Sequence, residues 1–134
     1  NMDIKFTAAV FTPQGLWAVP VGPGKNLSPM LAKQMGPLLA NRLQRAVQCA
    51  TAFTGEREQT IWLHEPLGGD APLSVLIYGT GKPEQAYTTP DALKLGGMLS
   101  AHAKTQQARE LHIVAPAGVA SADIALGVVL RAYQ

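Results

Sequence analysis

The stretch that decides the fold is Leu73–Lys82, which reads LSVLIYGTGK. Its first six residues are apolar apart from Ser74, and Gly79 and Gly81 follow them. A short apolar run that is rich in Val and Ile and ends at Gly is typical of a strand buried on both faces. Such strands lie inside a sheet that helices cover on both sides, so the stretch predicts an α/β domain.

The segments on either side supply the other elements of such a domain. Alternating or apolar runs predict four more strands, over residues 4–10, 16–21, 60–64 and 111–115. Helical periodicity and cap signals predict a short helix after Ser28-Pro29 and longer helices over residues 38–53, 90–106 and 121–134. This order predicts a three-layer α/β/α sandwich with a mixed sheet of about five to six strands.

Three local signals refine this expectation. The turn residues at 12–15 predict that the first two strands form a hairpin at one edge of the sheet. Thr89 is expected to cap the third helix, with Pro90 at its first position. The Gly96-Gly97 pair inside that helix costs on the order of 1 kcal/mol per Gly relative to Ala. We therefore expect this pair to pack closely against another backbone, in the sheet.

Composition limits the partners of the chain. Its 134 residues fit one domain, over residues 2–134. The net charge of +2, carried by scattered basic residues, gives no support for binding nucleic acid or an anionic membrane. Charged residues make up 15% of the chain, well below the usual share of about a quarter. Part of the surface is therefore expected to be covered by another domain or subunit.

Compartment and thiol chemistry follow from two further observations. No apolar run reaches the ~18 residues of a membrane span, and no signal-peptide pattern opens the sequence, so we expect a cytoplasmic protein. Cys49 is the single cysteine, which excludes an internal disulfide. It falls within the helical segment at residues 38–53 and is expected to be a small core residue rather than a nucleophile.

The glycines that follow the deciding stretch could hold phosphate. Gly79-x-Gly81 lies between a strand and a helix, where dinucleotide folds bind the pyrophosphate. The third Gly of that fingerprint is missing, and Pro83 separates the glycines from the helix. Lys82 is expected to be solvated. The segment 22–26 is similarly expected to be a connector, because Pro23 lacks an N–H donor.

Other chemistry-bearing residues form no recognisable catalytic pattern. His64, His102 and His112 lie far apart in sequence. His64 and His112 end or begin strands and are expected at the surface or at an edge, and His102 is expected on a helix facing solvent. No HExxH, GxSxG or paired-carboxylate pattern occurs. Trp17 and Trp62 lie in strands and are expected to be core or interface residues. We therefore expect no catalytic, cofactor-binding or metal-binding residue in this segment.

The last helix has two apolar faces. The apolar residues of the first face are Ile124, Ala125, Val128, Val129 and Ala132, and those of the second face are Leu126, Leu130 and Tyr133. A helix that is apolar nearly all round needs burial nearly all round. We expect the second face to be covered by another domain of the same chain or by a second subunit.

Several stretches together resemble a known family. They are Phe53-Thr54-Gly55, QTIWLH at 59–64, VLIYGTGK at 75–82, Leu95-Gly96-Gly97 and GVVLRAY at 127–133. In this order and spacing they are similar to the N-terminal domain of the leucyl aminopeptidase (cytosol aminopeptidase) family. The similarity covers about residues 50–134.

The resemblance implies a macro-domain-like fold within a larger cytoplasmic hydrolase, a metalloprotease that removes N-terminal amino acids from peptides. Such enzymes use two divalent metals, such as zinc or manganese, and usually form homohexamers. Their metal ligands and catalytic residues lie in a C-terminal domain, around an Asn-Thr-Asp-Ala-Glu-Gly-Arg motif that this sequence lacks. The resemblance thus implies an accessory domain that aids assembly and active-site access. The alternative is a macro-like module that binds a nucleotide such as ADP-ribose.

Overall fold

The deciding stretch forms strand β4 (Leu73–Gly79), which is buried along almost its whole length. In the computed structural model, which describes residues 3–6, 11–69 and 71–132, this strand belongs to a five-stranded sheet of order β1-β5-β2-β4-β3. The other strands are β1 (Asp3–Phe6), β2 (Gly15–Val21), β3 (Thr60–His64) and β5 (Glu110–Ile113). Only β3 runs antiparallel to its neighbour, so the sheet is mixed as predicted.

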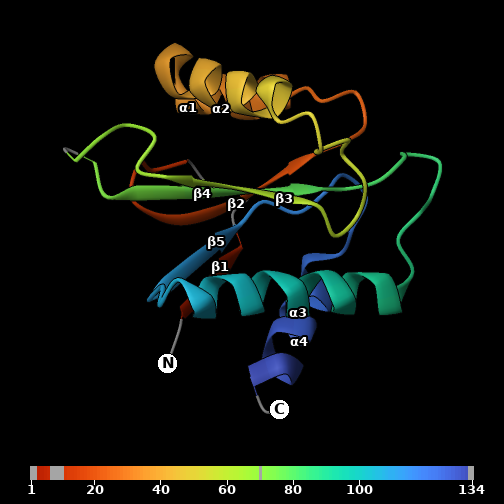
Figure 1. Ribbon diagram of the computed structural model, residues 1–134. Helices are drawn as coiled ribbons and strands as arrows, with labels where there is room; N and C mark the ends of the chain where they lie inside the picture. Colours follow the sequence, from red (N-terminus) through yellow and green to blue (C-terminus); the bar gives the residue numbers. More distant parts are fainter. Residues whose placement is uncertain (1–2, 7–10, 70, 133–134) are drawn as a thin grey trace.

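Helices cover both faces of this sheet (Figure 1). The pair α1 (Pro29–Met35) and α2 (Pro37–Cys49) lies on one face, and the pair α3 (Thr89–Thr105) and α4 (Ser121–Ala132) lies on the other. The predicted α/β/α sandwich is therefore confirmed. Among the described residues, no helix is both long and apolar enough to cross a membrane.

The predicted hairpin between the first two strands is wrong. Strand β5 lies between β1 and β2 and runs parallel to both, so that Leu111 faces Ile4 on one side and Leu16 on the other. The turn before β2 bonds elsewhere, since the Gly15 N–H donates to the carbonyl of Pro72. The short connection between β1 and β2 would permit a hairpin. The chain instead returns through α3 and places β5 between these two strands. Residues 7–10 of the predicted first strand lie outside the described residues.

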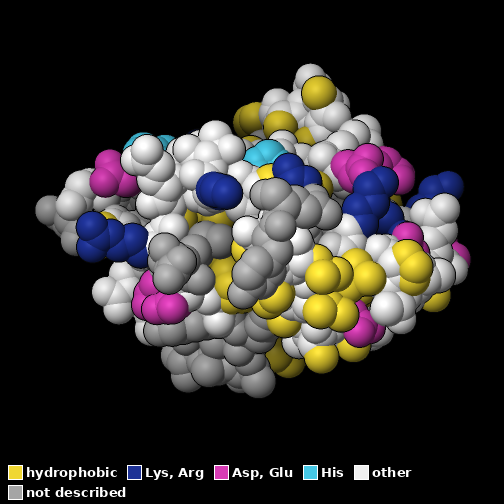
Figure 2. Space-filling view, turned by 90° about the horizontal axis from the view of Figure 1, so that it is seen from below, with side chains coloured by type: hydrophobic (Ala, Val, Ile, Leu, Met, Phe, Trp, Pro, Cys, Tyr) yellow, Lys and Arg dark blue, Asp and Glu magenta, His cyan; other side chains and the backbone are white. Residues whose placement is uncertain are grey.

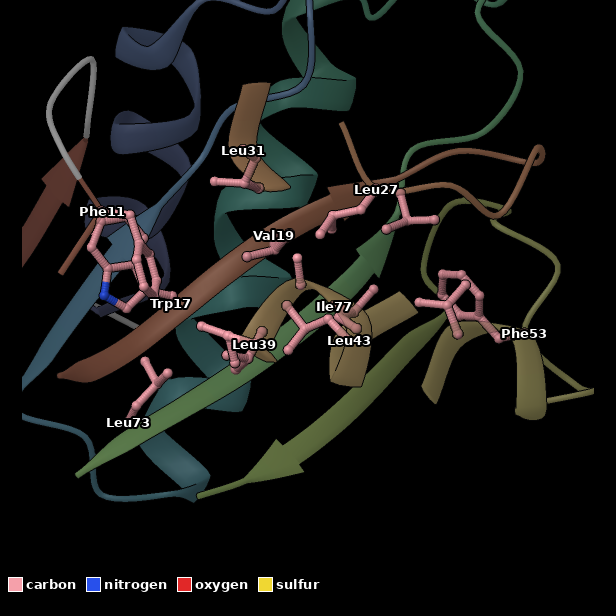
Figure 3. Close-up of a cluster of buried hydrophobic side chains, with 14 residues drawn as sticks. Phe11, Trp17, Val19, Leu27, Leu31, Leu39, Leu43, Phe53, Leu73 and Ile77 are labelled. Atoms are coloured by element: carbon pink, nitrogen blue, oxygen red, sulfur yellow. The ribbon is translucent and has the colours of Figure 1, made fainter. Parts of the chain in front are cut away.

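The core under α1 and α2 explains the helical pattern of that segment. Leu39, Leu43 and Val47 project from α2 onto Trp17 and Ile77 of the sheet, and all five side chains are essentially inaccessible. Figure 3 shows Leu39, Leu43, Trp17 and Ile77 among the buried side chains of this core.

The expectation that Cys49 belongs to this core is wrong, because its side chain is exposed. Position 49 is about 200° around the helix from Val47, which faces the core. The helical period therefore carries the thiol to the solvent side.

The two helices on the other face cross at their backbones. A Cβ at Gly96 would lie 2.0 Å from the Ile124 carbonyl oxygen, and one at Gly127 would lie 2.1 Å from that of Leu93. The glycine inside α3 therefore serves the close approach of α4, not of the sheet as expected. Fixed in this way, α4 runs outward from below α3 (Figure 1).

The start of α3 differs from the prediction by one residue. The cap is Thr88, whose hydroxyl accepts the Asp91 N–H at 3.2 Å, while the Asp91 carboxylate accepts the Thr88 N–H at 2.9 Å. This reciprocal capping box uses an acid three residues after the cap, which Thr89 lacks. Hydrogen bonding of the Asp91 carboxylate to the Thr88 backbone N–H and then to the Thr88 side chain, followed by the Arg57 guanidinium, lowers the pKa of Asp91.

Candidate functional site

The glycine-rich loop after β4 has its backbone donors occupied by protein. The N–H of Gly79 donates to Gln59 at 2.9 Å, that of Thr80 to Val21 at 3.1 Å and that of Gly81 to Gly55 at 2.9 Å. A phosphate site at a glycine loop depends on free N–H groups that point at the ligand. Because protein carbonyls accept all three of these N–H groups, the loop offers no such cradle.

The same glycines are required by packing. A Cβ at Gly79 would lie 1.9 Å from the Glu56 carbonyl oxygen, and one at Gly55 would lie 2.3 Å from the Gly22 carbonyl oxygen. Gly55 also has a φ of +79°, which favours glycine. The glycines thus allow the loops after β2, α2 and β4 to meet backbone to backbone.

Arg57 closes this loop cluster, and no sequence signal identified it. Its guanidinium donates to the carbonyls of Thr80 and Gln85, at 3.3 and 2.5 Å. It also lies 3.1 Å from the Asp91 carboxylate and 3.9 Å from the centre of the Tyr87 ring. Arg57 sits in a polar turn where the sequence shows only charge, so its role depends on residues 23 to 34 positions away. Lys82 is exposed, as expected. Together, these contacts give the nucleotide-binding alternative no support.

The three histidines lie in separate places. His64 is exposed on β3, with Nδ1 3.5 Å from the Ser74 hydroxyl, and His102 is half-exposed on α3. The expectation that His112 lies at the surface or at an edge is wrong. Because β5 is an inner strand, its side chain is 12% exposed, with the ring stacked on Trp17 at 4.5 Å and Nε2 3.3 Å from the Glu110 carboxylate.

The remaining sequence candidates are also structural. Trp17 is buried in the core and Trp62 is half-buried, in agreement with the expectation of core or interface positions. Within the described ranges, no group of three or more His, Cys, Asp or Glu side chains could hold a metal ion. The residues that the structure describes therefore do not fit a metal centre.

The outer face of α4 is the most open apolar surface at the end of the chain. We define it by Leu126, Val129 and Leu130, which are 47%, 49% and 49% exposed. Exposure of the two leucines is as predicted, but Val129 was expected on the inner face and lies on the outer one. Ile124 and Val128 alone of the large side chains turn inward, because the crossing at Gly127 points that side of α4 at α3. Tyr133 lies outside the described residues.

A hollow of about 380 Å³ continues this face between α3 and α4. Leu93, Met98 and Leu130 give it apolar walls, and charged side chains rim it. On the rim, Lys94 pairs with Glu58 at 2.6 Å. Figure 2 shows apolar side chains gathered on this side of the molecule, beside basic and acidic ones. An apolar centre with a charged rim is the usual composition of a protein–protein contact.

The structure therefore describes an α/β/α domain with closed loops and an open helix face. A family model described as "Cytosol aminopeptidase family, N-terminal domain" matches residues 18–134. The chain belongs to this family, and the matched part of the family is its N-terminal domain.

Comparison of structures agrees at the level of the fold. A mutant of leucine aminopeptidase from tomato superposes with a TM-score of 0.64 and 22% sequence identity, covering 100% of this chain and 29% of that one. At this identity the likeness establishes the fold. The chain thus spans less than a third of the length of the tomato enzyme. The comparison with curated proteins gave no match.

Proposed function

We propose that this chain is the non-catalytic N-terminal accessory domain of a longer, metal-dependent leucyl aminopeptidase, and that the outer face of α4 packs against the catalytic domain of that protein. The observation that carries the proposal is the exposure of the apolar side chains on the outer face of α4. Family membership and the 29% coverage of the tomato enzyme support it.

Burial of the outer face of α4 is energetically favourable. Full burial of one Leu or Val side chain stabilises a protein by roughly 1.5–3 kcal/mol relative to full exposure. The three side chains of the outer face are each about half exposed, so covering them gains a few kcal/mol in total. A covalently attached domain needs less than this, because the tether supplies a high effective concentration.

Catalysis is assigned to the rest of the longer protein. The two divalent metals, such as zinc or manganese, would be held there, and the accessory domain would aid assembly, in a cytoplasmic homohexamer, and access to the active site. The described residues of this chain offer no metal-ligand group that would argue otherwise. The 134-residue chain alone is expected to release no p-nitroaniline from leucine p-nitroanilide with zinc or manganese. Turnover that co-purifies with the chain through successive columns would refute the assignment.

The docking face is tested in the longer protein with the double variant Leu126→Glu and Leu130→Glu. We expect the accessory domain to unfold in a separate thermal transition at lower temperature, because the two carboxylates prevent burial of the outer face of α4. The matched control is Met30→Glu with Leu38→Glu, which changes side chains that are 74% and 59% exposed on the other helix pair. The control should unfold as the unmodified protein does. Unfolding of the α4 variant as a single unit with the rest would contradict the proposal.

A further inference from the structure

The outer side of strand β3 presents unpaired backbone groups. Among the described strands, β3 is last in the sheet order and pairs with β4 alone. The Gln59 carbonyl accepts the Gly79 N–H, which fixes the alternation of the antiparallel ladder. Ile61 and Leu63 then bond to β4. The N–H and C=O groups that point away from the sheet are those of Thr60, Trp62 and His64.

The two edges of the described sheet differ in how they are protected. Natural edge strands avoid pairing with other chains by carrying charges, Pro or bulges. Strand β1 carries Asp3 and Lys5 among its four residues. Strand β3 carries no Asp, Glu, Lys, Arg or Pro, and its register with β4 is unbroken. The β3 edge is therefore open to pairing in a way that the β1 edge is not.

We propose that β3 pairs in antiparallel fashion with β3 of a second copy of this chain, about a two-fold axis at Trp62. A two-fold axis requires a self-complementary surface, and the sequence TIWLH provides one. Thr60 meets His64 of the partner subunit, Ile61 meets Leu63 of the partner subunit, and Trp62 meets its own symmetry mate. The three outward-facing residues then bond in pairs, and the apolar side chains meet one another across the axis.

The space beside β3 suits this arrangement. On the α3 side of the sheet, a hollow of about 350 Å³ is lined by Trp62, His64, Ser74, Gln106 and Arg109, among others. Trp62 is half-buried there. The part of the Trp62 side chain that stays exposed can pack against Trp62 of the partner subunit. Because β3 contains no Asp, Glu, Lys or Arg, pairing of two copies brings no like charges from such residues together.

This inference concerns a different surface from the outer face of α4 and stands without the docking proposed above. Its first test needs no variant. Amide hydrogen exchange is measured on the 134-residue chain and on the longer protein, between about 10 µM and about 1 mM. The N–H groups of Thr60, Trp62 and His64 should exchange more slowly as concentration rises, by about tenfold or more. Exchange rates that do not depend on protein concentration would overturn the proposal. Slow exchange at every concentration in the longer protein would overturn it too, because another part of that protein would then cover the β3 edge.

The register is tested by disulfide trapping in a Cys49→Ser background, because Cys49 is exposed. In the proposed pairing the two Cα atoms of residue 62 lie about 5.5 Å apart, within disulfide range. The Trp62→Cys variant should therefore form a covalent dimer on mild oxidation. The Thr60→Cys variant should not, because its symmetry mate lies about 13 Å away. Thr60→Cys combined with His64→Cys should restore the dimer. Equal trapping of both single variants, or of neither, would overturn the register.

Discussion

The loops around Gly79 and the outer face of α4 differ in how fully their chemical groups are satisfied. In the loops, the N–H groups of residues 79 to 81 bond to protein carbonyls, and Arg57 binds two more carbonyls. On α4, three large apolar side chains remain about half exposed. The sequence draws attention to the loops because of their glycines, but the structure leaves the helix face open.

This difference shows that a glycine motif must be tested by asking what its N–H groups already bind. Gly79 and Gly81 occur where dinucleotide folds hold phosphate, yet a Cβ at Gly79 would meet the Glu56 backbone and one at Gly81 would meet the Arg57 side chain. The opposite holds for α4, which carries no ligand-binding motif but leaves three large apolar side chains about half exposed. For this chain, the proposed function therefore rests on the open helix face and not on the glycine motif.

The largest expected effect on stability comes from a substitution in the loops around Gly79. Gly79→Ala places a Cβ 1.9 Å from the Glu56 carbonyl oxygen, so the loop at residues 55–59 must shift. We expect a loss of about 3 kcal/mol in the free energy of unfolding, or roughly 10 °C in Tm. The control is Gly69→Ala, where nothing lies within 4 Å of the added Cβ. A Gly79→Ala variant as stable as this control, measured by urea unfolding, would mean that the loops are not closed as described.

Arg57 gives the next effect. Arg57→Ala removes the donors to Thr80 and Gln85, the ion pair with Asp91 and the contact with the Tyr87 ring. Hydrogen bonds from charged groups contribute about 1.5–3 kcal/mol, so we expect a loss of about 2 kcal/mol. Lys94→Ala removes an exposed ion pair with Glu58 and should cost clearly less, because water screens the attraction between these two side chains. Equal losses in the two variants would show that Arg57 does not hold the loops together.

The smallest effect on stability is expected for substitutions on the outer face of α4. In the 134-residue chain, Leu126→Glu with Leu130→Glu should change the free energy of unfolding by less than about 0.5 kcal/mol, as for other surface positions. The same variant should show less self-association by light scattering, because charged side chains replace two exposed apolar ones. A variant that unfolds outright would show that the outer face of α4 is part of the core.

Local signals in the sequence predicted most of the elements. Five strands, the helix pair on each face and the exposed leucines of α4 follow from apolar periodicity, turn residues and caps. The buried strand at residues 73–78 was correct because a continuous apolar run leaves little ambiguity about its environment. The resemblance to the cytosol aminopeptidase family was confirmed for the same domain.

What the sequence could not supply was the set of contacts between distant residues. The false hairpin arose because β5, which begins 89 positions after the end of β2 (110 − 21), inserts between the first two strands. The partner of Gly96 could be named only once α4 was placed beside it. Arg57 gave no signal because its acceptors lie in other loops. In each case a local pattern was compatible with several partners, and packing selected one.

The most direct test of the account measures the accessibility of residue 130. In a Cys49→Ser background, the rate at which a thiol reagent labels a Leu130→Cys variant is compared between the 134-residue chain and the longer protein. Labelling requires an accessible thiolate, so docking of α4 predicts a rate at least about tenfold lower in the longer protein. A Leu38→Cys variant, at a position 59% exposed on α2, should react at the same rate in both. Equal rates at position 130 would contradict the claim that the outer face of α4 is covered by the rest of the enzyme.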